Sequence, residues 1–380
     1  MAYSGNKMKE SITITNKKKD SATKIYFDFD LLSDPIFLRI CKGTSLRFAI
    51  ITDNKVGLLY GNSLVEFLKE NELDAVLFTF SQGEEHKNRK TMEKIENEMF
   101  EAKFGRDSCI IALGGGVVTD LAGFIAATYC RGIPFISIPT SLLGMVDASI
   151  GGKTGINITY GKNLLGAIFS PKAIFIDLTK LTTLPDIEMR NGAAEMIKHG
   201  LIADRHLFEK FSDDLEKWEQ RDLEFLSEMI YKNCLIKKKF VEEDLQETGK
   251  RRVINFGHTI GHALETLEGY HLAHGEAIAI GMVVESFISV KMGFLEEGEF
   301  DEIYRLFKLI HFPLKISKEI TVKKMMETMS YDKKAEGAIP RFIILDGIGK
   351  VLSYSGEYCT PIEDDLLQET LGWMISEFSR

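Results

Sequence analysis

The segment "SCIIALGGGVVTDLAGFIAATYC", residues 108–130, decides the fold of the first half of this chain. Its apolar start is typical of a buried strand, and the part after the glycines has the pattern of a helix. Glycine lets a ligand approach the backbone closely, and the N–H groups at a helix N-terminus attract phosphate. The segment therefore predicts a strand, a turn and a helix that together can bind a pyrophosphate. A tight glycine turn without any ligand remains the alternative.

Polar groups at the ends of two other predicted strands also favour a nucleotide site. Asp53 ends the apolar run 47–53, where a carboxylate can accept hydrogen bonds from an adenosine ribose. "QGEEHK", residues 82–87, follows the apolar run 75–80. The glycine turn itself departs from the GxGxxG fingerprint, because Thr119 stands in place of the last glycine. The three features together indicate a nucleotide more strongly than any one of them does.

Strand-like and helix-like segments alternate on both sides of the glycine turn. Further strands are predicted at "FISIPTS" (135–141) and "AIFIDL" (173–178), and helices at 61–73 and 85–104. Continuous apolar strands separated by helices are typical of a mainly parallel sheet that is covered on both faces. We therefore expect a Rossmann-like α/β fold in this half.

After Pro185 the pattern changes to long helical periodicities. They cover residues 186–212, 221–245, 253–267, 275–292 and 299–311, and strand chemistry is nearly absent apart from "RFIIL" (341–345). A chain of 380 residues exceeds the usual single-core limit. We expect an α/β domain at 1–185 and an all-α domain at 186–380. Residues 1–24 are predicted to be an extension that is either partly disordered or an early hairpin strand.

Composition excludes several classes of partner. The 47 Lys and Arg and 56 Asp and Glu residues give a net charge of −9, which argues against nucleic acid or an anionic membrane as the main partner. No apolar run approaches the length of a membrane span, and the N-terminus lacks the apolar core of a signal peptide. Five scattered cysteines without a CxxC pair are typical of reduced thiols. A cytoplasmic protein is the expectation.

Two segments carry lysines in surroundings that suggest a role for their charge. "DASIGGKTGINITYGKNLLGA", residues 147–167, holds Lys153 and Lys162 in a glycine-rich, loop-like context that suits an oxyanion or a phosphate. Solvated loop lysines are the alternative. "NGAAEMIKHG", residues 191–200, puts Glu195 and Lys198 three residues apart on one helical face among apolar neighbours. A surface ion pair is the simpler reading, but a buried carboxylate would need such a partner.

Four of the eight histidines lie in "INFGHTIGHALETLEGYHLAHGEAIAIGM", residues 254–282. His258 and His262 are four residues apart, the spacing that lets two imidazoles on one helical face meet a single ion. His274 precedes the next predicted helix. Two histidines and a carboxylate with open positions suit a catalytic zinc. Spacing alone favours His258 with His262, and a satisfied core histidine is the alternative for either.

The ordered motifs resemble the 3-dehydroquinate synthase family over roughly residues 45 to 350. They are "GEEHK", "GGGVVTDLAGF", "YCRG", "PTSLLGMVDASIGGKTGIN", "GKNLLGA", "AAEMIKHG", "NFGHTIGHALE" and "HGEAIAIGM". The resemblance implies an NAD-binding α/β domain, a helical metal-binding domain with zinc or cobalt, and a homodimer. Thr119 departs from the glycine of many members, and the N-terminal extension has no assigned counterpart.

The resemblance also implies a role for individual residues. The metal ligands would be Glu195, His258 and His274, whereas His262 would face the substrate and His271 would be a loop residue. NAD contacts would fall on Asp53, Glu84, Lys87, Gly115, Gly116, Asp120, Thr140, Ser141, Lys162 and Thr183. Substrate contacts would fall on Arg131, Asp147, Lys153, Asn163, Lys198, Lys237, Arg251, Asn255, His262 and Lys333, with Lys334 as the alternative to Lys333.

The activity that the resemblance implies is the conversion of 3-deoxy-D-arabino-heptulosonate 7-phosphate to 3-dehydroquinate and phosphate, in the shikimate pathway. NAD would oxidise the substrate transiently and be regenerated, so the reaction has no net redox change. Three alternatives stay open: another sugar-phosphate cyclase, such as a 2-deoxy-scyllo-inosose or valiolone-type synthase; a metal-dependent polyol dehydrogenase; and an inactive metal-binding descendant. The joint presence of Lys237, Arg251, Asn255 and His262 favours a substrate that carries a carboxylate.

Overall fold

The computed structural model describes residues 10–16, 21–269, 271–330, 339–353 and 356–379. It divides into two units, Met1–Pro185 and Asp186–Arg380, which are considered separately below. Within the described residues, no helix is both long enough and apolar enough to cross a membrane.

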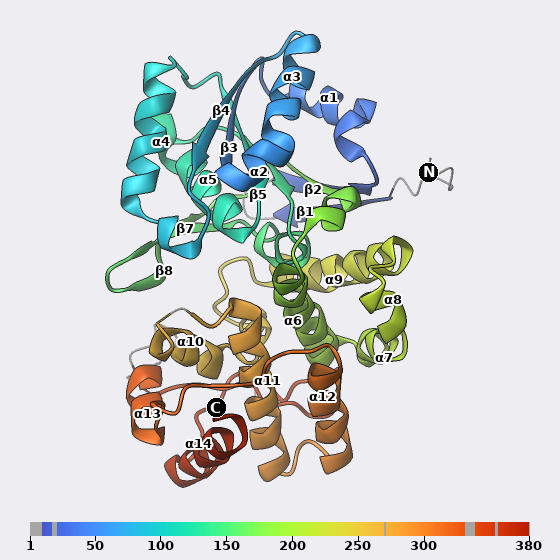
Figure 1. Cartoon of the computed structure of the whole chain (residues 1–380), viewed down its shortest axis with the longest axis vertical. Helices are drawn as coiled ribbons and strands as arrows, with labels where there is room; N and C mark the ends of the chain where they lie inside the picture. The colour runs from blue at the N-terminus through green and yellow to red at the C-terminus, as the bar shows by residue number, and fades with distance from the viewer. Residues whose placement is uncertain (1–9, 17–20, 270, 331–338, 354–355, 380) are drawn as a thin grey trace. The chain divides into compact units, whose positions relative to one another are not determined.

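The described part of the first unit is built on a seven-stranded sheet (Figure 1). The spatial order is β1, β2, β9, β6, β5, β3, β4, and all pairs are parallel except the antiparallel pair β1–β2. The strands are β1 (Glu10–Asn16), β2 (Ser21–Asp28), β3 (Arg47–Asp53), β4 (Asp74–Phe80), β5 (Cys109–Gly114), β6 (Phe135–Pro139) and β9 (Ala173–Asp177). This confirms the predicted α/β class and the mainly parallel sheet.

Alternation along β5 explains why the sheet is covered on both faces. Ile110 and Ala112 point into a core shared with helices α4 (Arg89–Glu101) and α5 (Gly116–Thr128). The intervening residues of β5 point into a second core shared with α1 (Pro35–Lys42) and α3 (Asn62–Glu70). Successive side chains of a strand face opposite sides, so a continuous apolar run is required when both sides are buried.

Two hairpins lie outside the simple strand–helix alternation. The pairing of β1 with β2 places residues 10–16 and 21–24 in the sheet as part of an antiparallel hairpin. The expectation of loop-like surroundings for Lys153 and Lys162 is wrong, because β7 (Lys153–Ile158) and β8 (Gly161–Ile168) pair as antiparallel strands. A Cβ on Gly166 would lie 2.0 Å from the Thr154 carbonyl oxygen, so glycine here permits tight strand contact rather than a loop.

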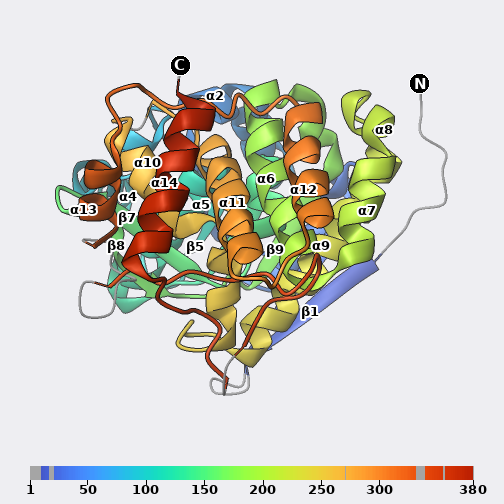
Figure 2. The same ribbon diagram turned by 90° about the horizontal axis from the view of Figure 1, so that it is seen from below.

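The second unit is helical, as predicted, and α11 lies among α6, α10, α12 and α14 (Figure 2). Its helices are α6 (Asp186–Ala203), α7 (Arg205–Asp213), α8 (Leu215–Glu219), α9 (Leu223–Glu243), α10 (His258–Leu267), α11 (His274–Lys291), α12 (Glu297–Leu309), α13 (Val322–Ser330) and α14 (Asp364–Phe378). Helix α11 is buried on nearly every side, as expected of a helix that is apolar all round.

Two expectations for this unit are wrong in detail. The periodicity over 186–212 is interrupted at Asp204, whose carboxylate accepts a hydrogen bond from the Leu207 N–H and so begins a separate helix, α7. The run 341–345 is not a regular strand, because in the described residues it makes only the isolated bridges Phe342–Thr360 and Leu345–Val351. Its apolar side chains are buried in the helical core, which explains its composition without a sheet.

Helices α10 and α11 touch through their backbones at glycine positions. A Cβ on Gly281, within α11, would lie 1.9 Å from the carbonyl oxygen of Gly257, the N-cap of α10. Gly257 has φ of 78°, in the left-handed region that favours glycine, and its own Cβ would lie 2.5 Å from Met282 Cγ. Side chains at this crossing would therefore force the two helices apart.

Replacing Gly281 by alanine is expected to lower the free energy of unfolding by roughly 3 kcal/mol, because the added methyl group meets rigid backbone. The matched control is Gly372→Ala in α14, where nothing lies within 4 Å of the new Cβ. That change should leave stability unaltered or raise it by up to about 1 kcal/mol through helix propensity. Urea unfolding measures both, and equal effects would contradict the importance of the crossing.

Candidate active site

The carboxyl ends of the parallel strands in the first unit carry the residues predicted to bind NAD. The chain moves from β3 outward to β4 and then returns to the other side of β3 with β5, so the strand order reverses between β3 and β5. Asp53 ends β3 and Gly114 ends β5 on either side of this point. Open α/β sheets bind their ligands at such a reversal.

Asp53 and the glycine turn have clear local roles there. The Asp53 carboxylate accepts hydrogen bonds of 2.9 Å from the N–H groups of Lys55 and Val56, which caps the short helix α2 (Asn54–Val56). Gly115 is the N-cap of α5, and a Cβ there would lie 3.2 Å from Ser141 Oγ. Glycine at this turn adds no side chain of its own at the start of α5, where backbone N–H groups can bind a phosphate.

Thr119 is accommodated inside α5. Its hydroxyl donates a 3.0 Å hydrogen bond to the Gly116 carbonyl oxygen of the preceding turn, and the side chain is buried. Thr140, at the end of β6, donates from its backbone N–H to the Gly114 carbonyl oxygen at 3.0 Å. Threonine in place of the expected glycine at position 119 is therefore accommodated by a hydrogen bond within α5, and its side chain does not extend across the glycine turn.

A buried lysine joins two carboxylates near the same edge. Lys87 Nζ lies 3.0 Å from Asp120 Oδ2 and 3.2 Å from Glu84 Oε1. Burial by itself lowers the pKa of Lys87, but the two carboxylates outweigh it and leave that pKa raised. Burial also raises the pKa of Asp120, although Lys87 opposes the shift, whereas the pKa of Glu84 is lowered against its own burial by Lys87, Asn157 and Lys162. The lysine is the fixed positive charge of this cluster.

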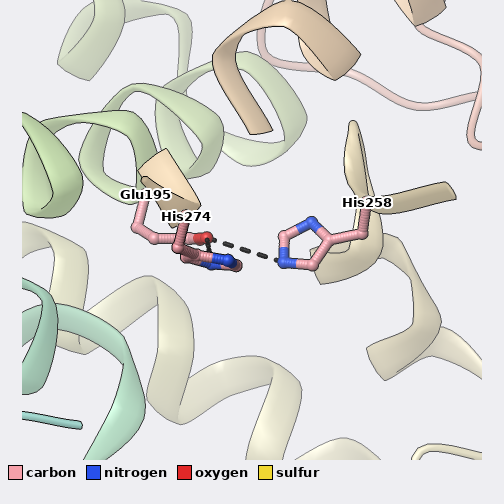
Figure 3. A group of neighbouring side chains, drawn as sticks. All are labelled: Glu195, His258 and His274. Carbon is pink, nitrogen blue, oxygen red and sulfur yellow. Dashed lines mark ion pairs between the residues drawn. The ribbon is translucent and has the colours of Figure 1, made fainter. Parts of the chain in front are cut away.

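In the second unit, three side chains from three helices converge on one point (Figure 3). Glu195 Oε1 lies 3.6 Å from His258 Nε2 and 3.4 Å from His274 Nε2. Glu195 is fully buried in α6, and the histidines are the first residues of α10 and α11. A buried carboxylate with two imidazole nitrogens is a donor set that zinc prefers, and a cation there would compensate the buried charge.

A close contact between α11 and α6 places His274 beside Glu195. The Gly275 N–H donates a 3.0 Å hydrogen bond to Asn191 Oδ1, and a Cβ on Gly275 would lie 2.5 Å from Asn191 Cα. Asn191 is one turn before Glu195 on α6. The start of α11 is thereby fastened to α6, which puts His274 beside Glu195.

His258 and His262, the pair favoured by helical spacing, do not fall in the same group of converging donors. Their rings are 5.2 Å apart, but the ring nitrogens fall into two different groups of converging donors. One group is Glu195, His258 and His274, and the other is His262, Glu265 and His274. Two carboxylates also act on His274: burial lowers its pKa, but Glu195 and Glu265 together raise it to about 10. His271 is an exposed residue of the α10–α11 loop.

The helical unit buries three cations that were predicted to contact substrate. Lys198, Lys237 and Arg251 are at most 4% exposed. Lys198 Nζ contacts Glu195 Oε2, so the pair predicted from spacing is present and buried. Asn255 donates from its amide to Glu247 Oε1. Long cationic side chains are rarely buried without compensation, so their burial favours an anionic ligand or a charged partner.

Asp244, which sequence reasoning missed, organises the segment that carries Arg251. Its carboxylate accepts hydrogen bonds from the N–H groups of Thr248 (3.1 Å), Gly249 (2.7 Å) and Arg251 (3.2 Å). Burial acts to raise the pKa of Asp244, but these N–H groups and the Arg251 charge lower it overall. An Asp followed four to seven residues later by N–H donors has no distinctive spacing, so only the folded loop reveals the role.

The remaining predicted residues lie in less enclosed surroundings. Arg131, Lys153 and Asn163 are exposed within the first unit, and Asp147 and Lys162 are partly buried. Asn163 has φ of 54° and donates from its N–H to Asn157 Oδ1 at 2.9 Å. The Thr183 hydroxyl contacts the Tyr60 hydroxyl. Lys333 and Lys334 lie outside the described residues, so the choice between them stays open.

Comparison with known proteins identifies the family of both units. Residues 77–191 match the family model for the N-terminal part of 3-dehydroquinate synthase, and residues 192–335 match the model for its C-terminal part. The chain is 42% identical over 328 residues to 3-dehydroquinate synthase of Pelobacter propionicus, covering 84% of this chain and 91% of that protein.

Solved structures of sugar-phosphate cyclases resemble the whole chain. A 2-deoxy-scyllo-inosose synthase, complexed with carbaglucose-6-phosphate, NAD+ and Co2+, superposes with a TM-score of 0.86 at 27% identity, covering 95% of this chain and 99% of that one. A 2-epi-5-epi-valiolone synthase from Streptomyces hygroscopicus, with NAD+ and Zn2+ bound, gives a TM-score of 0.84 at 27% identity, with 94% and 98% covered. With both family models matched in sequence order and the parallel sheet and helical unit in place, the chain belongs to the 3-dehydroquinate synthase family.

Proposed function

We propose that this protein is a 3-dehydroquinate synthase, which converts 3-deoxy-D-arabino-heptulosonate 7-phosphate to 3-dehydroquinate and inorganic phosphate in the shikimate pathway. The observation that carries the proposal is the convergence of Glu195, His258 and His274 in a chain of this family. The proposal includes the cytoplasmic homodimer that the resemblance implies, and the five cysteines, which are all free thiols, support a reducing compartment.

Zinc, with cobalt as the alternative, is proposed to bind Glu195, His258 and His274. The donor set supports this assignment, because one carboxylate oxygen and two Nε2 atoms converge and leave coordination positions for other ligands. When bound, the metal supplies a Lewis acid for substrate hydroxyls, and NAD supplies a transient acceptor for hydride. Lys198 holds the second oxygen of Glu195, so the carboxylate is oriented before any ligand arrives.

NAD is proposed to bind at the carboxyl edge of the sheet in the first unit. The start of α5 would receive the pyrophosphate, and Asp53 would accept hydrogen bonds from the ribose. Lys87, fixed between Asp120 and Glu84, supplies positive charge beside the turn. The further assignments stay predictions: Gly115, Gly116, Thr140, Ser141, Lys162 and Thr183.

A substrate with a phosphate and a carboxylate needs several cations. In the helical unit we propose that Lys198, Lys237 and Arg251 bind these anionic groups, with Asn255 and His262 donating hydrogen bonds. The burial of all three cations supports this, since each is held ready without reordering a long side chain. In the first unit, Arg131, Asp147, Lys153 and Asn163 keep their predicted substrate roles.

Two enzymatic alternatives are less well supported. The cyclases that make 2-deoxy-scyllo-inosose or 2-epi-5-epi-valiolone share the fold but only 27% of aligned residues with this chain. The identity of 42% to a 3-dehydroquinate synthase favours the heptulosonate substrate. A polyol dehydrogenase would accumulate NADH and has no need of so many cations for an anionic substrate.

Incubation with metal, NAD+ and the heptulosonate phosphate should release phosphate and form 3-dehydroquinate without net NADH absorbance, because hydride is returned within the same turnover. Phosphate, product and NADH are measured together. Parallel reactions with other sugar phosphates serve as the control for substrate choice. Sustained NADH accumulation, or cyclisation of a different sugar phosphate instead, would rule out the proposed activity.

His258→Ala should abolish metal binding, because it removes one of two imidazole ligands. His262→Ala should retain the metal and lower turnover by about a hundredfold, as expected when a substrate-facing proton donor or acceptor is removed. Metal content after dialysis and kcat separate the two effects. Equal loss of metal in both variants would show that the helical pair, His258 with His262, is the metal site instead.

Lys87→Met should lower the free energy of unfolding by about 3 kcal/mol even without NAD, because it leaves the Asp120 and Glu84 carboxylates uncompensated. It should also weaken NAD binding. The control is Lys94→Met on α4, whose 3.6 Å pair with Glu98 is exposed and should contribute under about 1 kcal/mol. Urea unfolding and NAD titration of both variants test this, and equal stabilities would contradict the role of Lys87.

A further inference from the structure

His274 has a carboxylate at each of its two ring nitrogens. Its Nε2 atom lies 3.4 Å from Glu195 Oε1, and its Nδ1 atom lies 3.4 Å from Glu265 Oε1. Glu265 is 2% exposed and lies on α10, seven residues after His258. The family resemblance gave Glu265 no role, although a carboxylate this deeply buried is costly to keep charged without a donor or a cation nearby.

The two nitrogens of His274 belong to the two alternative groups of donors. A histidine that ligates a metal is a neutral imidazole with a proton on one ring nitrogen, so only the other nitrogen offers a lone pair to the metal. A metal on the Nε2 side would have Glu195 and His258 as its other ligands, whereas a metal on the Nδ1 side would have His262 and Glu265. The proton on His274 therefore decides which group holds the metal.

The hydrogen bond of His258 settles which side is ready for a metal. Its Nδ1 atom lies 3.1 Å from the Phe256 carbonyl oxygen, which can only accept a hydrogen bond. The proton of His258 is thus on Nδ1, and its Nε2 lone pair faces Glu195. His274 presents the same arrangement when its proton is on Nδ1, toward Glu265, and its Nε2 lone pair faces Glu195.

We propose that Glu265 is a positioning residue that accepts the Nδ1 proton of His274 as a hydrogen bond and thereby directs Nε2 to the metal held with Glu195 and His258. The inference rests on the metal centre of the proposed function. Outer-sphere carboxylates of this kind fix both the tautomer and the ring orientation of a ligating histidine. Glu265 does for His274 what the Phe256 carbonyl does for His258.

The fold itself places Glu265 beside His274, because Glu265 lies on the same helix as the proposed ligand His258. Seven residues span about two helical turns, so His258 and Glu265 lie on one side of α10. The same helix therefore provides a ligand at its first residue and the outer-sphere carboxylate two turns later. The backbone crossing at Gly257 and Gly281 holds α10 against α11, which carries His274.

The test is zinc affinity, measured by competition with a chromophoric chelator on the full chain. Glu265→Ala should weaken zinc binding about tenfold to a hundredfold, in the range found when an outer-sphere partner is removed. Glu265→Gln should recover part of that loss, since its carbonyl oxygen still accepts the Nδ1–H. The cobalt-loaded variants should also show a shifted visible absorption spectrum, which a general loss of stability would not produce.

The matched control is Glu285→Gln, which changes another fully buried carboxylate in the same unit, on α11. It should leave zinc affinity unchanged, and circular dichroism of all metal-free variants checks folding. Unchanged affinity in Glu265→Ala, or equal losses in Glu265→Ala and Glu285→Gln, would overturn the inference. The inference would also be overturned if the natural chain bound two zinc ions and the Glu265→Gln variant bound only one, because Glu265 would then be a metal ligand. A natural chain that binds no zinc would refute the proposed metal centre itself.

Discussion

The helical unit depends on backbone contact between helices at glycine positions. Gly281 of α11 leaves room for the carbonyl oxygen of Gly257, and Gly275 leaves room for Asn191 of α6. A Cβ on Gly281 would lie 1.9 Å from that oxygen and one on Gly275 would lie 2.5 Å from Asn191 Cα, so a side chain at either position would force the helices apart. Close packing of this kind is why residues from three helices can place single atoms within a coordination sphere.

This arrangement buries several charged side chains, which is energetically unfavourable, but the same side chains can bind a metal and an anionic substrate. Glu195, Glu265, Lys198 and Arg251 are all nearly or fully buried in one helical unit. A protein interior tolerates such groups only when each is compensated by a partner, a hydrogen bond or a ligand. Lys198 contacts Glu195, His274 lies between two carboxylates, and Asp244 anchors the segment that carries Arg251. The polar network is therefore ordered before any ligand binds, which is the condition for precise placement of reacting groups.

Much of the fold and part of the candidate site could be predicted from the sequence. The apolar runs of β3, β4, β5, β6 and β9 are continuous because both faces of the sheet are covered, and this pattern is visible without coordinates. The β7–β8 hairpin was missed because its glycines resemble a loop when the partner strand is unknown. The run 341–345 has the composition of a strand because a buried irregular segment and a buried strand contain the same apolar residues.

By itself, the sequence determined the α/β class of the first half, the helical class of the second, and, through its ordered motifs, the family. It also determined which residue types were available for a metal and for an anionic substrate. The resemblance implied Glu195, His258 and His274 where helical spacing favoured His258 with His262, and the tertiary structure supports the former by bringing those three donors together, because helical spacing fixes which side chains share a face but not where their nitrogens point. Glu265 and Asp244 became visible only in the folded chain. Glu265 on α10 contacts His274 Nδ1 on α11, and Asp244 accepts hydrogen bonds from the N–H groups of a loop. Neither contact has a signature in the local sequence.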